Sequence, residues 1–220
     1  MNIFDFETYI FDCDGVILDT NRVKINCFMK TISSYDCNKQ DQFLRYLIEN
    51  GGVTRDLKYR YFLKEIVGIE DKEKVDCLAK DLVRDFSEKV QVELAQSIFT
   101  KGFLAFIDKL KSRGKKIYVW TGGRESEVIK MIHDKGIDSF FSGVYGAPGG
   151  KEESLKRLVA KEKISTDKTI IIGDSEEDLK GAMLLNIMFL FISGYTDITL
   201  STKNTINDFE SIESIKLMRG

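Results

Sequence analysis

The chain has 220 residues, of which 43% are hydrophobic and 31% are charged. This balance is typical of a folded globular protein and excludes a disordered or fibrous chain, and the length fits one domain or one and a half. The 33 basic and 35 acidic residues leave a net charge of −2. Such a chain has no positive field that would attract nucleic acid, so we expect no nucleic-acid partner.

Several sequence features indicate a cytoplasmic protein without a membrane partner. The stretch Met1–Glu7 is acidic and has no basic start, so it does not resemble a signal peptide. The longest apolar run, Ile187–Ile192, is far shorter than the ~20 residues that span a bilayer. No two cysteines have CxxC spacing, which is typical of reduced thiols in a cytosolic protein. The cysteines are Cys13, Cys27, Cys37 and Cys77.

Five short apolar runs predict β-strands. Most are continuous rather than alternating, as expected for parallel strands that are buried on both faces. The runs are Tyr9–Phe11, Lys116–Trp120, Gly143–Tyr145, Thr169–Ile172 and Met188–Ile192. Amphipathic stretches alternate with the later runs and predict the helices Gly102–Arg113, Glu125–Lys135, Glu152–Lys163 and Glu177–Leu185. This alternation predicts an α/β fold with a parallel, Rossmann-like sheet.

The connection between the first two strands is abnormally long, because a simple βαβ unit needs only about 30 residues. The stretch from Asn21 to about Leu94 contains no strand-like run. It predicts amphipathic helices at Arg22–Ile32, Gln40–Glu49, Thr54–Val67 and Lys72–Val92. We therefore expect an α/β core made of residues 1–20 and 95–220, with an inserted helical domain at residues 21–94.

Polar residues follow four of the predicted strands. Ligands of an open parallel sheet bind outside the carboxyl ends of its strands, so these residues are candidates for a site. They are Asp12-Cys13-Asp14-Gly15, then Thr121-Gly122-Gly123, then Gly146–Gly150 leading to Lys151, and last Gly173-Asp174 with Asp178. We expect Gly122 and Gly123 to open the helix after the second strand. These residues would place carboxylates, a hydroxyl and a lysine together at the carboxyl edge of the sheet, which is called the rim below.

In order and spacing, these four motifs resemble those of the haloacid dehalogenase-like (HAD) superfamily. The resemblance covers roughly residues 8–20 and 100–195, and the helical insertion resembles the small cap domain of one large subgroup. It implies that Asp12 is a nucleophile that attacks phosphorus, and that Asp14 is the general acid and base. In having an aspartate at position 14, the chain resembles the family's phosphatases and mutases, whereas family dehalogenases lack this aspartate.

The resemblance also assigns the remaining residues of the rim. Thr121, with Gly122, is expected to bind the phosphate, together with Lys151. The expected cofactor is Mg²⁺, held by Asp12, Asp174 and the backbone carbonyl of Asp14. Asp178 is expected to orient Lys151 or a metal-bound water. The cation is needed because Asp12, Asp174 and a phosphate dianion together carry about −4, which one lysine cannot offset.

The function implied is hydrolysis of a small phosphomonoester, such as a sugar, polyol, amino-alcohol or hydroxy-acid phosphate, through an aspartyl-phosphate intermediate. A phosphomutase of the same fold and a non-catalytic regulatory or binding protein remain open alternatives. Residues 49–55 of the insertion, with Arg55, are the candidates for substrate selection; a plain interhelical turn with a solvent-exposed arginine is the alternative. The protein is expected to be a monomer or dimer whose partner is the small phosphate ester.

Overall fold

In the described part of the chain, six parallel strands form one sheet in the order β3-β2-β1-β4-β5-β6. The computed structural model describes residues 1–147 and 149–218. The strands are β1 (Thr8–Phe11), β2 (Lys116–Arg124), β3 (Gly143–Ala147), β4 (Thr169–Gly173), β5 (Met188–Ile192) and β6 (Thr205–Ile206). The predicted α/β class with a parallel Rossmann-like sheet is confirmed. Strand β6 was not predicted, because two residues carry no recognisable apolar run.

The register of the sheet brings the polar motifs together. Strand β1 lies between β2 and β4, so that Phe11 is level with Val119 on one side and with Ile172 on the other. The residues that follow these three positions therefore emerge side by side at the carboxyl edge of the sheet. This placement follows from topology, since β1 is a central strand and every strand of the sheet runs in the same direction.

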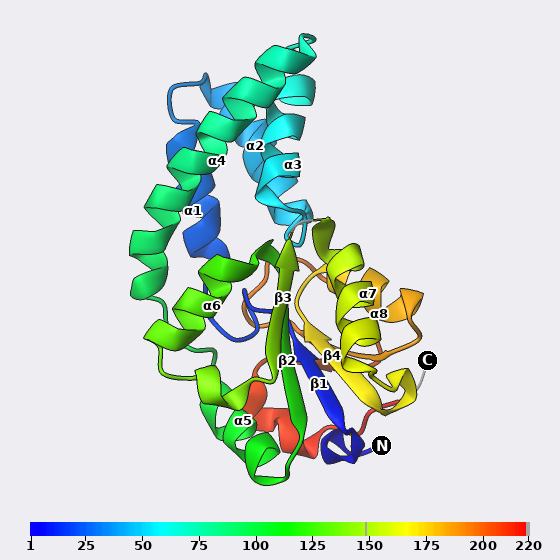
Figure 1. Cartoon of the computed structure of the whole chain (residues 1–220). Coiled ribbons are helices and arrows are strands. Elements are labelled where there is room, and N and C mark those ends of the chain that lie inside the picture. Colours follow the sequence, from blue (N-terminus) through cyan, green and yellow to red (C-terminus); the bar gives the residue numbers. More distant parts are fainter. Residues whose placement is uncertain (148, 219–220) are drawn as a thin grey trace.

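Helices cover both faces of the sheet (Figure 1). Helices α5 (Phe103–Ser112) and α6 (Glu125–Asp134) lie on one face, and α7 (Gly150–Glu162) and α8 (Glu176–Leu184) lie on the other. Each layer has its own apolar cluster against the sheet. Short 3₁₀ segments lie at Ile3–Asp5, Asp138–Phe140, Thr166–Lys168 and Phe209–Ser214.

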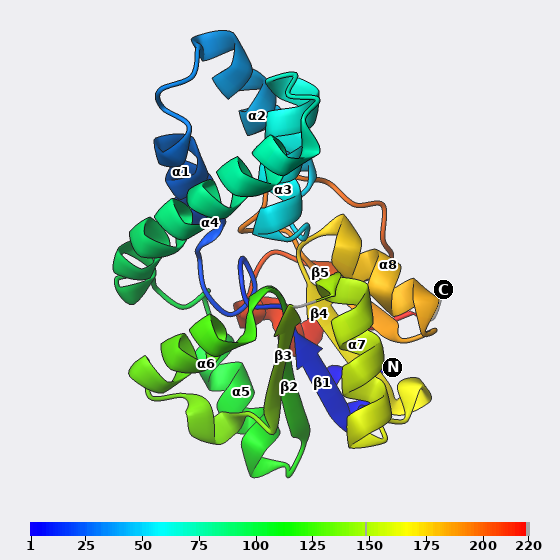
Figure 2. The ribbon, with the colours of Figure 1, turned by 45° about the horizontal axis from the view of Figure 1, so that its top comes forward.

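The long insertion after β1 is helical. It contains α1 (Asn21–Thr31), α2 (Cys37–Glu49), α3 (Arg55–Tyr61), a π-helical stretch at Phe62–Ile66, and α4 (Lys72–Ala95). These helices share an apolar cluster of their own that is rich in aromatic rings. They lie beyond the carboxyl ends of the strands in both ribbon views (Figures 1 and 2). The insertion, called the cap below, is therefore placed over the rim that carries the polar motifs.

The structure differs from the sequence prediction at the end of β2. Gly122 and Gly123 do not open the following helix, because β2 continues to Arg124 and α6 begins at Glu125. The pairing of β2 with β3 is irregular between Trp120 and Arg124. A side chain at Gly122 would lie 2.7 Å from the backbone oxygen of Gly52, so glycine lets the cap approach the strand closely here.

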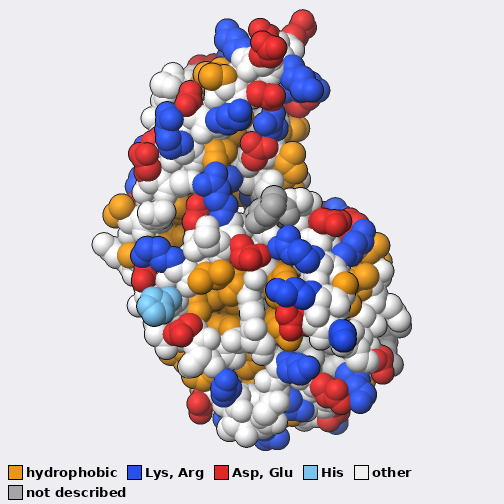
Figure 3. Space-filling model, viewed as in Figure 1, with side chains coloured by type: hydrophobic (Ala, Val, Ile, Leu, Met, Phe, Trp, Pro, Cys, Tyr) orange, Lys and Arg blue, Asp and Glu red, His pale blue; other side chains and the backbone are white. Residues whose placement is uncertain are grey.

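The surface carries acidic and basic side chains in a mixed pattern (Figure 3). The face shown in that view has no large patch of one sign, which agrees with the small net charge of −2. Among the helices of residues 1–147 and 149–218, none combines the length and the apolar character needed to cross a membrane.

Candidate active site

Asp12 lies at the centre of the rim, directly after β1. Its backbone N–H donates to the carbonyl of Ile172 at 2.9 Å, which extends the ladder between β1 and β4 by one residue. The side chain is only 5% exposed, and its Oδ1 accepts a hydrogen bond from Nζ of Lys151 at 2.7 Å. Burial raises the pKa of Asp12 to about 7, although the Lys151 ammonium opposes the shift. The second oxygen, Oδ2, accepts no hydrogen bond from the described residues and is available to contact a ligand.

Lys151 lies in the first turn of α7 and bridges two carboxylates. Its Nζ is 2.7 Å from Oδ1 of Asp12 and 2.6 Å from Oδ1 of Asp178. Burial alone would lower its pKa, but the two carboxylates outweigh burial and raise it. The indole N–H of Trp120 donates to the backbone carbonyl of Lys151 at 2.7 Å, which anchors the helix turn to β2. The lysine is therefore held as a fixed, permanently charged ammonium.

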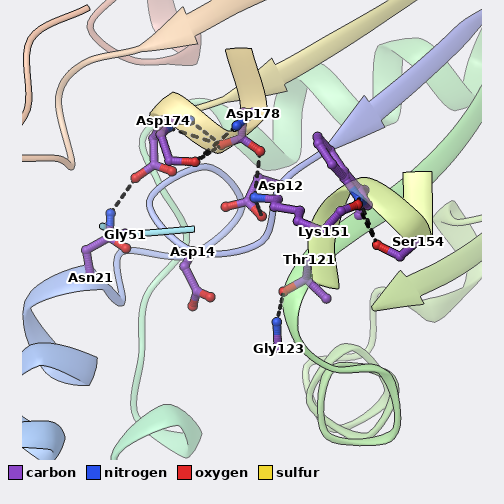
Figure 4. Close-up of polar contacts among 12 residues, drawn as sticks. Asp12, Asp14, Asn21, Gly51, Thr121, Gly123, Lys151, Ser154, Asp174 and Asp178 are labelled. Atoms are coloured by element: carbon purple, nitrogen blue, oxygen red, sulfur yellow. Dashed lines mark hydrogen bonds and ion pairs between the residues drawn. The ribbon is translucent and has the colours of Figure 1, made fainter. Parts of the chain in front are cut away.

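Asp178 is fixed by the turn between β4 and α8. Its Oδ2 accepts hydrogen bonds from the backbone N–H groups of Asp174 and Ser175, at 3.2 and 3.1 Å, and from the hydroxyl of Ser175 at 2.6 Å. Ser175 in turn caps α8 by accepting from the backbone N–H of Asp178. This capping box leaves Oδ1 of Asp178 directed at Lys151 (Figure 4). The same carboxylate thus orients the lysine and the turn that carries Asp174.

Three buried carboxylates are close enough to share a cation. One oxygen from each of Asp12, Asp174 and Asp178 lies within 4.8 Å of the others. Burial raises the pKa of Asp174 well above its usual range, and the neighbouring charges of Asp12 and Asp178 raise it further. The Lys151 ammonium opposes this rise in pKa, and so does Asn21, whose amide donates to Oδ2 of Asp174 at 2.5 Å. Crowded oxygens of this kind suit a hard divalent cation such as Mg²⁺.

The loop after Asp14 needs a glycine. Gly15 has a φ of +72°, and a Cβ atom there would lie 2.2 Å from Oδ2 of Asp174. Any larger residue would therefore strain the backbone and push Asp174 out of the cluster. Gly15 lets the chain turn back so that the loop of Asp14 and the turn of Asp174 touch.

The side chain of Asp14 points away from the other three carboxylates (Figure 4). Its Oδ1 accepts from the hydroxyl of Thr20 at 2.5 Å, and its Oδ2 is paired with Nζ of Lys24 in α1. Burial favours the neutral acid, but the Lys24 ammonium and the hydrogen bonds from Lys24 and Thr20 outweigh it and lower the pKa of Asp14. The cap thus supplies a cation to a carboxylate of the core.

Thr121 is fully buried within β2. Its hydroxyl oxygen accepts from the backbone N–H of Gly123 at 3.0 Å, which leaves the hydroxyl hydrogen free to be donated. Gly122 lines the cavity between the cap and the rim, as do Asp12 and Asp14. Gly122 and Gly123, which are predicted from the sequence to open a helix, belong in the structure to the irregular end of β2.

A cavity of about 100 Å³ lies between the cap and the rim. It is smaller than the ~150 Å³ cavity that holds a benzene molecule in an engineered protein, so this arrangement of the cap fits a small substrate. Its floor carries Asp12, Asp14 and Asp174, and its cap side is largely apolar. The apolar cap residues are Ile25, Phe28, Leu47, Ile48, Val53 and Phe86.

Arg55 lines this cavity, as do Gly51, Gly52 and Val53 of the predicted selection loop. Its guanidinium, however, forms a bidentate ion pair with Glu127 of α6, at 2.5 and 3.1 Å, and donates to the hydroxyl of Ser87 at 2.8 Å. The arginine is therefore neither solvent-exposed nor free. It joins α3 of the cap to α6 of the core.

Three residues of the site were missed by the sequence analysis: Asn21, Lys24 and Lys58. Asn21 and Lys24 open the first cap helix, shortly after the Asp12–Gly15 motif, and reach back to Asp174 and Asp14. Lys58 stands three residues after Arg55 in the same helix, and both line the cavity. That spacing was a usable signal, because residues three apart share a helix face.

Comparison with known proteins gives the same family that the motifs indicated. The family model described as haloacid dehalogenase-like hydrolase matches residues 9–192. The chain is also similar to pyrophosphatase PpaX of Bacillus mycoides, with 24% identity over 185 residues that cover 79% of this chain and 77% of the relative.

Solved structures share the fold over nearly the whole chain. CbbY from Rhodobacter sphaeroides in complex with phosphate has a TM-score of 0.75 at 15% identity, covering 96% of this chain and 100% of the other. The HAD-hydrolase YfnB from Bacillus subtilis, bound to magnesium, has a TM-score of 0.68 at 19% identity and covers 94% and 96%. The family match extends over more than half of the chain and includes all four strand-end motifs. The protein therefore belongs to the haloacid dehalogenase-like hydrolases.

Proposed function

We propose that the protein is a Mg²⁺-dependent phosphatase that hydrolyses a small phosphomonoester metabolite through an aspartyl-phosphate intermediate. The observation that carries this proposal is the arrangement of Asp12, whose Oδ2 is free while its Oδ1 is bonded to Lys151, beside Asp174 and under the cap. PpaX, a pyrophosphatase, and CbbY, which binds phosphate and, as a variant, xylulose-1,5-bisphosphate, give support from related proteins.

Asp12 is the proposed nucleophile. An oxygen of its carboxylate attacks phosphorus, and the bond between phosphorus and the ester oxygen breaks. A carboxylate needs no base to remove a proton first. Lys151 donates to the other oxygen and offsets the negative charge that the substrate dianion brings. Thr121, whose hydroxyl hydrogen is free, and Gly122 are the proposed phosphate-binding groups of β2.

Asp14 is the proposed acid and base. As an acid it gives its proton to the leaving alkoxide, and as a base it then takes a proton from the water that attacks the aspartyl-phosphate. The second attack breaks the bond between phosphorus and Asp12 and releases inorganic phosphate. Thr20 and Lys24 hold the Asp14 carboxylate in one orientation at the edge of the cavity.

Asp12 and Asp174, with the backbone carbonyl of Asp14, are the proposed ligands of Mg²⁺. When bound, the ion supplies positive charge against the phosphate oxygens and the crowded carboxylates. Asp178 is already committed to Lys151 and to the turn after β4, so we assign it the role of a positioning residue.

Hydrolysis of p-nitrophenyl phosphate tests the proposal. We expect turnover with Mg²⁺, complete loss on addition of EDTA, and recovery when excess Mg²⁺ is added back. The physical reason is that the rim carries more negative charge than Lys151 alone offsets. Full activity in the presence of the chelator would contradict the metal assignment, and no turnover with any phosphomonoester would contradict the proposed function.

Asp174→Asn separates metal binding from the stability of the fold. In EDTA at pH 7.5 the variant should melt several degrees above the wild type, because a carboxyl whose pKa is raised by folding destabilises the fold at this pH and asparagine does not titrate. About 1 kcal/mol corresponds to roughly 2–4 °C for a chain of this size. Mg²⁺ should raise the Tm of the wild type and leave that of Asp174→Asn unchanged. An equal response of both proteins would remove Asp174 from the ligand set.

Arg55→Ala tests whether Arg55 selects the substrate or holds the cap. Because its guanidinium is occupied by Glu127 and Ser87, we expect kcat/KM to fall about 5- to 10-fold for p-nitrophenyl phosphate and metabolite alike. Glu127→Ala should cause a similar loss, and the double variant should be little worse, because the two side chains act as a pair. A loss confined to the metabolite would instead assign Arg55 to substrate selection, as the sequence predicted.

A further inference from the structure

Lys58 is a buried cation of the cap. It lies in α3, is only 6% exposed, and lines the cavity opposite the rim. Its Nζ donates to the backbone carbonyl of Gly51 at 2.9 Å and lies 5.4 Å from the centre of the Phe28 ring. Within the described part of the chain, no carboxylate forms an ion pair with it. An ammonium has three hydrogens to donate, so this one has capacity for a ligand.

The other cap cations of the cavity are already paired. Lys24 pairs with Asp14, and Arg55 pairs with Glu127. Lys58 therefore brings the unbalanced positive charge to the cap side of the cavity, where its other neighbours are mostly apolar. Burying such a charge costs several kcal/mol unless an anion compensates it. A buried, unpaired ionisable group in a cavity is a candidate for a binding role.

The charge distribution around Lys58 agrees with a missing anion. Burial is the main cause that lowers its pKa to about 8, and the ammonium groups of Lys24 and Lys151 lower it further. Asp14 and Glu177 act in the opposite direction, but neither is bonded to it. A bound anion would restore the favourable environment that burial removes.

We propose that Lys58 binds a carboxylate on the non-reacting end of the substrate, so that the preferred substrate is a short phosphorylated hydroxy acid. This inference rests on the proposed phosphatase function and narrows its substrate class. The phosphate lies against Asp12 and Lys151 on the core side, and the carboxylate lies against Lys58 on the cap side. A cationic end would be repelled there, and a neutral alcohol would leave the ammonium uncompensated. The cavity of about 100 Å³ limits the carbon chain between the two groups to a few atoms.

A matched series of two-carbon esters tests the proposal. The probes are the phosphate esters of glycolate, ethylene glycol and ethanolamine, which share a size and differ in the charge of the far end. We expect kcat/KM to be about 10- to 100-fold higher for the glycolate ester than for the glycol ester, and lowest for the ethanolamine ester. Propane-1,3-diol bisphosphate distinguishes a second phosphate from a carboxylate. A bisphosphate preferred over the glycolate ester overturns the carboxylate assignment, as does an equal rate for the glycolate and glycol esters.

Substitution of the lysine identifies its contribution. Lys58→Met keeps the apolar length of the side chain and removes the charge. It should lower kcat/KM for the glycolate ester about 10- to 100-fold and change that for the glycol ester far less. Its Tm should not fall, because an uncompensated charge has been removed. Lys64→Met, at a cap lysine that is 70% exposed, is the control and should leave both substrates unchanged. Equal losses for both esters in Lys58→Met overturn the proposal.

Two further measurements separate this inference from its rivals. Glu177, whose Oε2 is buried without a hydrogen-bond partner, is the alternative partner of Lys58. If the lysine serves Glu177, Glu177→Gln should reproduce the losses of Lys58→Met, and that result overturns the proposal. Calorimetric binding of the glycolate and glycol esters to Asp12→Asn protein with Mg²⁺ requires no turnover. We expect the Asp12→Asn protein to bind the glycolate ester more tightly than the glycol ester, and the double variant Asp12→Asn/Lys58→Met to bind both equally. This result supports the inference even if the phosphatase function fails.

Discussion

Asp12→Asn should lower kcat for p-nitrophenyl phosphate by about 10⁴- to 10⁶-fold, the range seen when a nucleophile is removed from a covalent mechanism. An amide oxygen is a far weaker nucleophile than a carboxylate oxygen, and the other carboxylates of the site are held by partners of their own. Asp174 accepts a hydrogen bond from the amide of Asn21. Asp178 is bonded to Lys151, Ser175 and the backbone of the turn. Asp14 is bonded to Thr20 and Lys24.

The fold of Asp12→Asn should survive the substitution. Lys151 keeps Asp178 at 2.6 Å as a partner, so no isolated buried charge is left behind. The asparagine oxygen can still accept from Lys151, and its backbone N–H still extends the sheet to Ile172. Far-ultraviolet circular dichroism and Tm, compared with the surface variant Asp108→Asn, check the fold. Activity within 100-fold of the wild type would contradict the role of Asp12 as nucleophile.

The core of the site could be predicted because its parts are local in the sequence. Asp12, Lys151 and Asp174 each follow a short apolar strand directly or open the next helix. The parallel order of the strands then brings these ends together whatever the details of packing. Carboxylates and a lysine in that setting restrict the chemistry strongly, and their order and spacing carry the resemblance to the family.

The interface between cap and core could not be predicted in the same way. The pair of Arg55 with Glu127 joins residues that are 72 positions apart and depends on how two separately packed units meet. Lys24 likewise has an ordinary position on an amphipathic helix, and the docking of the cap directs it into the cavity. For Lys58 the sequence offers one signal, its spacing of three residues from Arg55. The sequence prediction ends the strand at Thr121 and lets Gly122 and Gly123 open the next helix, where free N–H groups would suit a phosphate oxygen. In the structure the strand continues past these glycines, because Arg124 still pairs with Ala147 of β3 after the irregularity.

Asp14→Asn should separate substrates by their leaving groups. Removing a general acid costs about 10²- to 10⁴-fold when the leaving group is a strongly basic alkoxide. p-Nitrophenolate is a weak base that departs without a proton. For its ester, the fold loss in the rate of the first chemical step should therefore be at least about tenfold smaller than for an alkyl ester. The measurement is a burst experiment that follows p-nitrophenol release, beside steady-state release of phosphate from an alkyl ester. Equal losses in the two measurements would contradict Asp14 as the general acid.

Asp14 must be protonated to act as the general acid, and its contacts with Lys24 and Thr20 oppose this. With Lys24 and Thr20 bound to it, the pKa of Asp14 is lowered, so the substrate-free carboxyl is ionised and has no proton to give. A substrate dianion brings negative charge next to the carboxylate, and a like charge raises a carboxyl pKa.

Lys24→Met removes the main opposing cation and should raise the pKa of Asp14. We therefore expect Lys24→Met to shift the alkaline limb of the pH profile for an alkyl ester upward. The same limb for p-nitrophenyl phosphate should move less, because that ester does not need the proton. An unchanged profile for both esters would show that Lys24 positions the cap without controlling the acid.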